Sequence, residues 1–379
     1  PGLSNFFNQG SNLISFQNFK RQWEEVGAEV EKAMSKLGST GWYILGNSLQ
    51  EFEKALAKHT DFSYCQGVGN GLDAIEISLR SLGIRSGDKV LTTPLSAFAT
   101  TLAIIRAGGC PVFCDTDENG LIDLKLASEA IEKHKIKYFV PVHLFGQMLD
   151  IEALNEIKER TDIRIVEDAA QSICGHHLFD IETKSDFIAT SFYPTKNLGA
   201  MGDGGAILTN QSSLNDKASY LKNYGQTDKY VHSHLGMNSR LDELQSAILL
   251  VHLKYLDQWL KKRAAIGKKY LQQINNPAIR KISSQVTRNV WHIFPVFLSD
   301  SAARERFVHF LKENNIQTSI HFPHLIPDQQ AMKEIDTLIF GKLVHANQIS
   351  QAVVSLPLHP YLLDEEVEKI ISVCNNWKG

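Results

Sequence analysis

The sequence predicts an α/β protein, with a large domain built on a mostly parallel sheet with helices on both faces, and a smaller C-terminal α+β domain. Two observations support this fold class. From Phe62 to Thr209, short β-rich segments alternate with longer segments of helical periodicity, which is the pattern of βαβ units. Beyond about residue 276 this alternation ends, and the 379 residues suit one large domain and a smaller one.

Each element of the large domain follows from its local pattern. The amphipathic stretch Ile14–Leu37 predicts a helix that ends at the turn Gly38–Gly41. Four strand-like segments follow, each with a helical segment after it. The strands are expected at 62–68, 89–93, 110–114 and 137–142, and the helices that follow them at 73–82, 97–107, 125–133 and 150–159. A fifth strand is expected at 164–167. Two more strands are expected at 187–192 and 206–209, and an apolar stripe predicts a long helix over 238–270.

The smaller domain begins near the end of that long helix. Its expected elements are strands at 290–298 and 317–321 and helices at 302–313 and 364–376. We therefore expect an N-terminal segment with the start of the first helix over residues 1–24, the large domain over 25–260 and the small domain over 261–379.

The composition argues against several classes of partner. Lys and Arg total 39 against 42 Asp and Glu, so no basic excess indicates nucleic-acid binding. The longest apolar runs are broken by Lys, Pro or His, and none approaches a membrane span. The five cysteines form no CxxC motif, which favours a reducing, cytoplasmic location. The opening residues PGLSNFFNQGSNLIS match neither a signal peptide nor a transit peptide.

Two carboxylates, Glu167 and Asp168, end a strand-like segment and are followed by small residues. Side chains alternate along a strand, so we expect only one of the two to face a ligand. In an open α/β sheet, ligands bind at the carboxyl ends of the strands, where an acid can hold the protonated ring nitrogen of a cofactor. Taken alone, a solvated acid at a strand end explains Asp168 more simply.

Lys196 follows a second strand, in the stretch SFYPTKNLGAMGDGGA. If the two strands are neighbours, its amine and the carboxylate of Asp168 face one crevice. Pyridoxal phosphate enzymes need this pair, because the lysine holds the cofactor carbonyl as a Schiff base and the acid keeps the ring nitrogen protonated. By itself, Lys196 could equally be a loop lysine. Four glycines follow Lys196: Gly199, Gly202, Gly204 and Gly205. They either let the backbone pass close to a ligand or form a plain hairpin.

The turn Val68–Ile75 places glycines between a strand and a helix start. Free N–H groups and the helix dipole favour an anion there, so one phosphate would suffice to explain the turn. A dinucleotide fingerprint is weak, because Leu72 replaces the last glycine of GxGxxG and no strand-end acid follows at the usual spacing. A tight strand–helix turn without a ligand also fits.

Three other segments carry side chains suited to a site. Phe98 follows a strand end, where its ring could stack on a cofactor or pack in the core. Asn238 can cap the long helix, and Arg240 in its first turn calls for an anionic partner, because its charge opposes the helix dipole. His321 and His324 have no third ligand at zinc spacing, so contacts to a polar substrate fit better than a metal site, although plain loop histidines also fit.

Together, the segments VEDAAQS, SFYPTKNLGAMGDGGA and GMNSRLDELQSA resemble the pyridoxal-phosphate sugar aminotransferases of the DegT/DnrJ type. The stretches GSTGWYILGNSLQEFEKALAKH and VSLPLHPYLLDEEVEKI resemble the same family, and the resemblance covers nearly the whole chain from about Leu13. It implies an aspartate-aminotransferase-like (type I) fold with a sheet of the seven-stranded type. It also implies pyridoxal 5′-phosphate and its pyridoxamine form as cofactor and L-glutamate as amino donor.

The resemblance also assigns roles by position. Lys196 would be the Schiff-base lysine and general base, and Asp168 would pair with the ring nitrogen. The active site would lie between the subunits of a homodimer, with Asn238 reaching the partner's phosphate. Phosphate binding is implied for Ser191 with Asn70, Gly71 and Leu72, ring contacts for Phe98, Ala170 and Gln171, and substrate contacts for His321, Tyr193 and Arg240.

Two departures from the family pattern concern the cofactor site. The phosphate turn is often Ser-Gly-Thr in the family, whereas Asn70-Gly71-Leu72 lacks a hydroxyl, which puts side-chain contacts in doubt but not backbone ones. The sequence Ser96-Ala97-Phe98 lacks the threonine that usually precedes the aromatic residue. A related dehydratase branch replaces the lysine by histidine, so Lys196 favours transamination.

The form GNGLDA of the phosphate turn resembles the members that aminate position three of a dTDP-linked keto-6-deoxyhexose. This implies a role in amino-sugar synthesis for O-antigen, lipopolysaccharide or another surface glycan. Three alternatives stay open: amination at position four, a non-catalytic pyridoxal-phosphate-binding regulator, and a nicotinamide oxidoreductase that uses the turn Gly67–Gly71.

Overall fold

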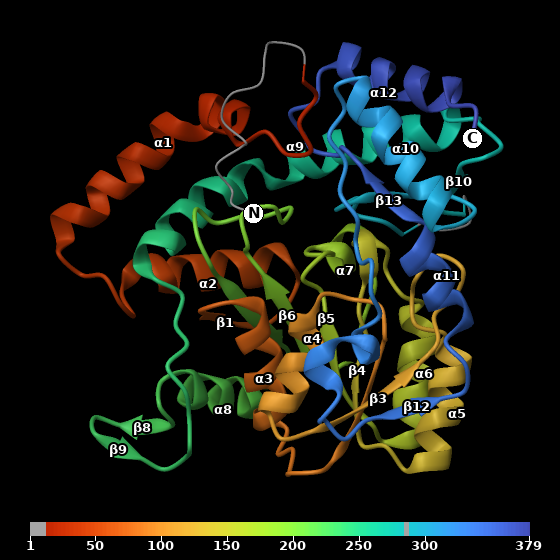
Figure 1. The fold of residues 1–379 in the computed structure, drawn as a ribbon. Coiled ribbons are helices and arrows are strands. Elements are labelled where there is room, and N and C mark those ends of the chain that lie inside the picture. Colours follow the sequence, from red (N-terminus) through yellow and green to blue (C-terminus); the bar gives the residue numbers. More distant parts are fainter. Residues whose placement is uncertain (1–12, 284–287) are drawn as a thin grey trace.

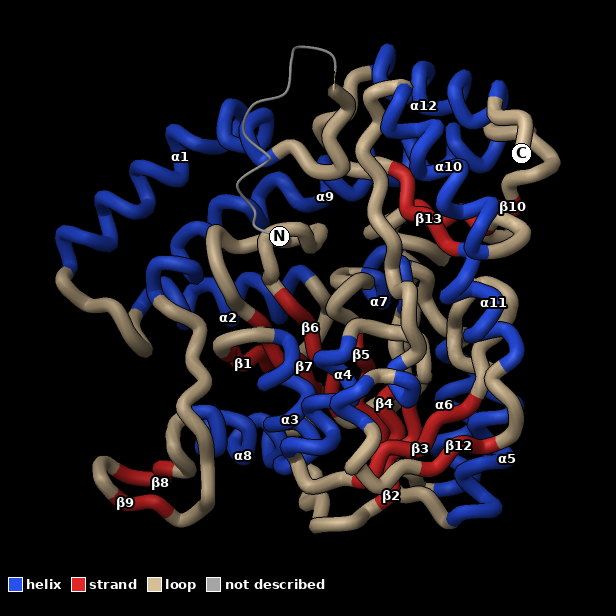
Figure 2. Tube along the Cα trace, viewed as in Figure 1, coloured by secondary structure: helices blue, strands red, loops and turns tan. Residues whose placement is uncertain are grey.

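The computed structural model describes residues 13–283 and 288–379, so Pro1, Gly2 and most of the opening stretch assessed for targeting lie outside the described residues. An eight-stranded sheet in the order β1-β7-β6-β5-β4-β2-β3-β12 forms the centre of the described molecule (Figures 1 and 2). Its strands are β1 Tyr64–Val68, β2 Lys89–Thr92, β3 Cys110–Cys114, β4 Tyr138–Val140, β5 Arg164–Asp168, β6 Phe187–Ser191, β7 Gly205–Thr209 and β12 Leu338–Phe340.

The predicted mostly parallel sheet is confirmed, but it has eight strands rather than the seven expected, because β12 adds to its edge. All neighbouring pairs from β12 to β6 are parallel, and only β7 runs antiparallel to both of its neighbours, β6 and β1. The central strands are buried on both faces, as parallel strands under two helical layers must be. β12 joins the edge of the sheet beside β3, although it lies far along the chain, in the range expected for the small domain.

Helices cover both faces of the central sheet (Figure 1). One apolar layer packs the sheet against α3 Gly71–Ser81, α4 Phe98–Arg106 and α8 Ser212–Lys222. On the other face lie α2 Asn47–His59, α5 Leu124–His134, α6 Ile151–Thr161 and α9 Glu243–Gln273. The side chains of Asn70, Asp123 and Asp150 accept backbone N–H groups at the starts of α3, α5 and α6, which fixes where these helices begin.

A second, smaller sheet lies beside the first. Its strands are β10 Arg280–Lys281, β11 Phe294–Phe297 and β13 Val353–Leu356, and all its pairs are antiparallel. Tyr270, Phe294 and Phe307 belong to a separate apolar core under this sheet. The nearby helices are α10 Ser301–Glu313, α11 Val344–Ala352 and α12 Asp364–Asn376, and the short helices of the chain are α7 Gly175–Leu178, η2 Leu144–Gly146, η3 Ile326–Asp328 and η4 Gln330–Met332.

Three predicted elements differ in the structure. The first helix, α1 Phe19–Thr40, starts five residues late because the side chain of Asn18 caps it, while Ile14 forms a bridge with Ile316. The segment 317–321 does not form a strand. The chain there makes only two isolated bridges, Ile316 with Ile14 and Ser319 with Ser355, and no continuous ladder. Strand 290–298 shortens to β11.

The long helix also starts later than predicted. α9 begins at Glu243 after the N-cap residue Asp242, so Asn238 does not cap it and Arg240 is not in its first turn. The reason is tertiary: Asn238 pairs with Asn223 in a backbone bridge, and the next amide, at Ser239, donates to Lys222 O, which holds the chain extended along α8.

Two parts extend from the body of the molecule (Figure 1). α1 packs along α9, and a hairpin of β8 Gln226–Asp228 and β9 Val231–His232 projects beyond α8. Across the described ranges, no helix combines the length and the apolar character needed to cross a membrane.

Candidate active site

A cavity of about 450 Å³ opens at the carboxyl ends of β5 and β6. This is the size of a small-molecule site. The cavity brings together most of the side chains predicted for the site, from elements far apart in the chain. Those that line it are Asn70, Gly71, Leu72, Asp168, Ala170, Gln171, Ser191, Tyr193 and Lys196.

Asp168 ends β5, and two contacts hold its carboxylate in the cavity wall. Oδ2 accepts the Thr100 hydroxyl at 2.8 Å, and Oδ1 accepts the Ala170 amide at 3.1 Å. The Ser96 and Thr100 hydroxyls lie 3.1 Å apart, which extends the network along α4. A buried carboxylate held on both oxygens has a defined orientation, so Asp168 can face a cationic ring nitrogen without moving.

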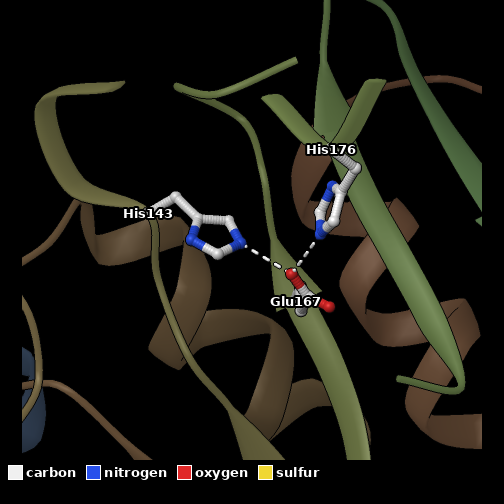
Figure 3. Close-up of side chains that lie close together, drawn as sticks. All are labelled: His143, Glu167 and His176. Carbon is white, nitrogen blue, oxygen red and sulfur yellow. Dashed lines mark hydrogen bonds and ion pairs between the residues drawn. The ribbon is translucent and has the colours of Figure 1, made fainter. Parts of the chain in front are cut away.

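Glu167 faces the other side of the sheet, as strand alternation predicted. Its Oε2 lies 2.7 Å from His143 Nε2 and 2.9 Å from His176 Nε2 (Figure 3), and the Thr183 hydroxyl donates to Oε1 at 2.6 Å. Burial raises the pKa of Glu167, but the charge of His176 and the hydrogen bonds from both histidines outweigh it and hold this pKa well below its ordinary value. Glu167 therefore anchors β5 from behind the cavity.

The cluster His143, Glu167 and His176 also has the composition of a metal site, with one ligand atom from each residue within 4.8 Å of the others. The hydrogen bonds favour a different role. The Leu149 amide donates to His143 Nδ1 at 3.2 Å, which leaves the proton of the neutral ring on Nε2, where it donates to Glu167. The three side chains are thus already joined as a hydrogen-bonded network (Figure 3).

Lys196 lies in the loop between β6 and β7. The Lys196 amide donates to Tyr193 O, and the Ala200 amide donates to Phe192 O, so this loop is a compact turn. Burial lowers the pKa of Lys196 to about 8, against the charge of Asp168, which raises it. A lysine with this pKa is partly neutral near physiological pH, which a Schiff-base nucleophile requires.

The turn before α3 forms the other end of the cavity. Asn70 Oδ1 accepts the Asp73 amide at 2.8 Å, and Ser239 Oγ bridges the Gly69 amide and Asp73 Oδ2. A Cβ on Gly71 would lie 2.8 Å from Ser191 Cβ, so only glycine lets the turn approach the end of β6. The amides of Gly71 and Leu72, the first two of α3, have no acceptor within the helix and are available to an anion, whereas the Asp73 amide is taken by Asn70.

The glycines after Lys196 have a structural role that the sequence left undecided. A Cβ on Gly205 would lie 2.5 Å from the backbone of Asn70, and one on Gly199 would lie 2.3 Å from Pro194 O. Gly205 is paired with Ser191 across the β6–β7 hairpin. These two glycines therefore admit neighbouring backbone, and Gly205 supports the phosphate turn from behind.

Four predicted site residues do not line the cavity. Phe98 instead packs against the apolar cluster of Phe113, Ile326 and Met332, and its neighbours Ala97 and Ala99 line the cavity. This follows from α4 starting at Phe98, which turns that ring toward the elements that precede β12.

Asn238 and Arg240 lie at the base of the β8–β9 hairpin. Arg240 Nη1 donates to Asn223 Oδ1 at 3.0 Å, and its guanidinium lies 5.1 Å from the ring centre of Tyr224. The anionic partner expected for Arg240 is thus replaced, within the described residues, by an amide oxygen and an aromatic ring.

His321 approaches Lys196 from the small domain without lining the cavity. Its Nδ1 lies 2.9 Å from Ser355 Oγ, and its ring stacks on Phe16 at 5.8 Å. Burial, assisted by the charge of Lys196, lowers the pKa of His321 to about 4, so its ring is neutral at physiological pH.

Sequence reasoning missed several residues of the site. Thr100 orients Asp168, and Arg106 and Asp203 line the same cavity. Arg106 Nε also pairs with Glu76 at 2.8 Å. The one signal for Thr100 was its position in the first turn of a helix that starts just after a strand end.

The residues present fit pyridoxal phosphate. An anion-binding turn, a partly neutral lysine and a fixed carboxylate line one cavity, which suits the phosphate, the aldehyde and the ring nitrogen of that cofactor. Gln171 Oε1 accepts the Phe145 amide at 2.8 Å, which leaves its Nε2 available to a ring substituent.

Comparison with known proteins agrees with this chemistry. Residues 24–375 match the model of the DegT/DnrJ/EryC1/StrS aminotransferase family. A dTDP-3-amino-3,6-dideoxy-alpha-D-galactopyranose transaminase from Aneurinibacillus thermoaerophilus is 38% identical over 96% of this chain and 99% of its own. A dTDP-3-amino-3,4,6-trideoxy-alpha-D-glucose transaminase from Streptomyces venezuelae is 34% identical over 96% of each.

Among solved structures, S. venezuelae DesV in complex with a ketimine intermediate superposes with a TM-score of 0.90 at 33% identity. That match covers 97% of this chain and 99% of DesV. The chain therefore belongs to the DegT/DnrJ/EryC1/StrS aminotransferase family and is a pyridoxal-phosphate-dependent aminotransferase.

Proposed function

We propose that this aminotransferase moves the amino group of L-glutamate to the keto group at position three of a dTDP-linked keto-6-deoxyhexose. The observation that carries the proposal is the convergence of Lys196, Asp168 and the Asn70–Leu72 turn in one cavity. The dTDP-sugar substrate class rests on the two relatives whose names contain 3-amino dTDP-sugars. The products are 2-oxoglutarate and a 3-amino sugar nucleotide.

We assign the cofactor contacts from the cavity wall. The backbone of Asn70, Gly71 and Leu72 binds the phosphate together with Ser191. Asp168 would hold the ring nitrogen, Gln171 would donate to the ring hydroxyl, and Ala170 would pack against the ring. Phe98 keeps its assignment to the other face only if its ring turns from the cluster of Phe113 when the cofactor binds.

The cofactor, when bound, supplies an electron sink that stabilises negative charge on the carbon that loses its proton. Lys196 would move that proton: its neutral amine can accept a proton from the donor's α-carbon, and its protonated form can return a proton when the keto sugar is aminated. One lysine can act as base and acid in turn because its pKa of about 8 is close to the working pH. Asp168 keeps the ring nitrogen protonated in both half-reactions.

We also assign the sugar side of the site. Tyr193 lines the cavity and is exposed, so it can contact the sugar nucleotide. His321, a neutral ring beside Lys196, can donate to a sugar oxygen or accept from a hydroxyl. Arg240 lies near the β8–β9 hairpin and away from the cavity of its own chain. It would therefore contact the substrate only if a second subunit placed its own cavity beside this hairpin.

A homodimer is the proposed assembly. The β8–β9 hairpin region exposes Tyr230 at 82% and Leu235 at 92%, and apolar side chains on a projecting hairpin favour burial against another chain. Asn238, at the base of this hairpin, would then reach the phosphate in the partner subunit. The cysteines of the described residues are all free, which supports a cytoplasmic location, and the sugar would serve O-antigen, lipopolysaccharide or another surface glycan.

The proposed domain boundary at residue 260 divides α9, and the one at residue 24 lies within α1. Leu249 and Leu256 pack in the core of the large sheet, whereas Tyr270 packs in the core of the small one. The helix thus links the two units as a single rod.

The test is incubation of the pyridoxal-phosphate-loaded protein with L-glutamate and a panel of dTDP-linked 3-keto and 4-keto sugars, with products identified by mass and NMR. A 3-amino product is expected. A 4-amino product would replace the position assignment, and no product from any sugar would favour a regulatory protein. A Lys196→Ala variant should fold and show no turnover, and turnover near the wild-type rate would remove Lys196 from its role.

A cofactor measurement separates the remaining alternative. The loaded protein should show a visible absorbance band that borohydride abolishes, as a lysine Schiff base does. NADH-dependent quenching without that band would indicate a nicotinamide oxidoreductase.

A further inference from the structure

A second, narrower cavity lies on the far side of Lys196. Lys196 belongs to its lining as well as to that of the cofactor cavity, so the lysine forms a wall between the two. The remaining lining comes from the loop around Lys196, from the N-terminus of α1, from α9 and from the loop after β13, and it includes Asn18, Gln22 and Arg263. Its volume is about 20 Å³, the size of one water molecule.

Arg263 is the unusual residue of this cavity. Its side chain is 3% exposed, and Nη1 donates to the carbonyl oxygens of Trp291, His292 and Leu358 at 3.3, 3.2 and 2.7 Å. Nε is buried with no hydrogen-bond partner, and none of the described carboxylates forms an ion pair with this guanidinium. A buried cation without an anion is costly, and where one persists an anionic ligand is a natural partner.

Two acids that contact residues at or beside this cavity, Glu366 and Glu25, are occupied by other donors. Glu366 accepts two hydrogen bonds from Arg21, at 2.6 and 2.8 Å. Glu25 accepts Trp259 Nε1 at 2.9 Å and the Tyr361 hydroxyl at 2.8 Å. Neither acid therefore neutralises the guanidinium of Arg263. Burial lowers the pKa of Arg263 to about 10, so this side chain is still charged at neutral pH.

Other groups add to the positive character of the cavity. The first turn of α1 lies in its lining, and although Asn18 accepts the Arg21 and Gln22 amides, the first two amides of the helix, those of Phe19 and Lys20, have no acceptor within it. The charges of Lys196 and Arg263 both oppose protonation of His292, whose pKa burial already holds well below its ordinary value. Free N–H groups, a guanidinium and an amine around one space are the chemistry that binds a carboxylate.

We propose that Arg263 binds a carboxylate of the amino donor in the space beside Lys196. The inference rests on the proposed function, since it names the residue that recognises the acid in the glutamate half-reaction. A carboxylate placed here lies next to the amine that removes the α-proton, so one contact both selects an amino acid and orients its reacting carbon.

The experiment measures a bound acid rather than turnover alone. Glutarate has the two carboxylates of the donor but neither amine nor ketone, so its affinity for the pyridoxamine-phosphate-loaded protein is measured by calorimetry. Arg263→Gln removes the cation, and Gln22→Glu adds a negative charge to the same cavity from α1. Gln272→Glu, at an exposed position near the end of α9, is the control for added charge.

Both cavity variants should bind glutarate at least about tenfold more weakly, the loss expected when one hydrogen bond to a charged group is removed. The KM for glutamate should rise in parallel while the KM for the keto sugar stays unchanged, and Gln272→Glu should match the wild type. If Arg263→Gln does not fold, because three carbonyl groups lose their donor, Gln22→Glu decides alone.

Wild-type glutarate affinity in the folded cavity variants would overturn the inference and leave Arg263 as a structural donor beside a buried water. Failure of the wild type to convert glutamate to 2-oxoglutarate would instead refute the proposed function. The two failures are therefore distinguishable, because glutarate binding does not require turnover.

Discussion

Replacing Gly205 by alanine tests whether the phosphate turn depends on the strand behind it. Gly205 starts β7, and a Cβ there would lie 2.5 Å from the carbonyl carbon and oxygen of Asn70 and 2.8 Å from the amide nitrogen of Gly71. Non-bonded carbon atoms prefer separations of about 3.5–4.0 Å, so the turn must move by about 1 Å. The atoms that must move are backbone, and no rotamer change can relieve the clash.

The displacement should weaken cofactor binding more than it weakens the fold. A misplacement of about 1 Å in a binding group can cost about a hundredfold, so we expect the affinity for pyridoxal phosphate to fall by about ten- to a hundredfold. The free energy of unfolding should fall by about 1–3 kcal/mol, as for other overpacked sites. Spectrophotometric titration of the cofactor-free protein and urea denaturation measure the two quantities.

Gly38→Ala is the matched control. Gly38 lies in α1, and a Cβ on it would have nothing within 4 Å, so the same chemical change meets open space. Its cofactor affinity should equal that of the wild type, and its stability should be equal or up to about 1 kcal/mol higher. A folded Gly205→Ala variant with wild-type cofactor affinity would refute the claim that Gly205 supports the turn.

Four further predictions concern Lys196, Thr100 and Glu167. Burial lowers the pKa of Lys196 to about 8, so the rate at which the cofactor-free protein forms its visible Schiff-base band with added pyridoxal phosphate should rise from pH 7 to pH 9. Asp168→Asn should move the midpoint of this pH profile lower, because the charge of Asp168 raises the pKa of Lys196. A rate that does not depend on pH would contradict this prediction. The folded chain then binds fewer protons than the unfolded chain between about pH 8 and 10.5, so Lys196 makes stability rise with pH in that window, as denaturation of wild type and Lys196→Met can measure. Thr100→Val should slow proton abstraction by roughly tenfold, because Asp168 loses the hydroxyl that orients it. Thr100→Ser keeps that hydroxyl and should stay near the wild-type rate. Equal single-turnover rates for the two variants would remove Thr100 from this role. Glu167→Gln should lower the free energy of unfolding by about 3–5 kcal/mol. In the wild type, the pKa of Glu167 is depressed in the folded state, so the stabilisation by this carboxylate should be lost only as pH falls below about 4.5. An unchanged denaturation midpoint of Glu167→Gln at pH 7 would show that the network is dispensable.

The sequence was sufficient wherever the information is local. Helical and strand periodicity, together with glycine turns, predicted the parallel sheet and most of its helices, because each element buries its own apolar face. Lys196 and Asp168 could be placed together on the condition that their strands are neighbours, and the parallel pairing of β5 and β6 meets that condition. Helix boundaries were less certain where capping depended on distant chain, as at Asn18 and Asn238.

Only the tertiary structure decided which groups surround those two residues. Thr100 and Asp168 are 68 residues apart, and no periodicity within either segment relates them. Gly205 acquires its role from the backbone of Asn70, and Phe98 is drawn toward an apolar cluster that includes residues far along the chain. Arg263 is one of several basic residues along a helix in the sequence, and only folding buries it beside Lys196. The reason is physical: the amino-acid order determines which surfaces each element must bury, whereas the packing of distant elements determines which polar groups are desolvated together and therefore what chemistry they can perform.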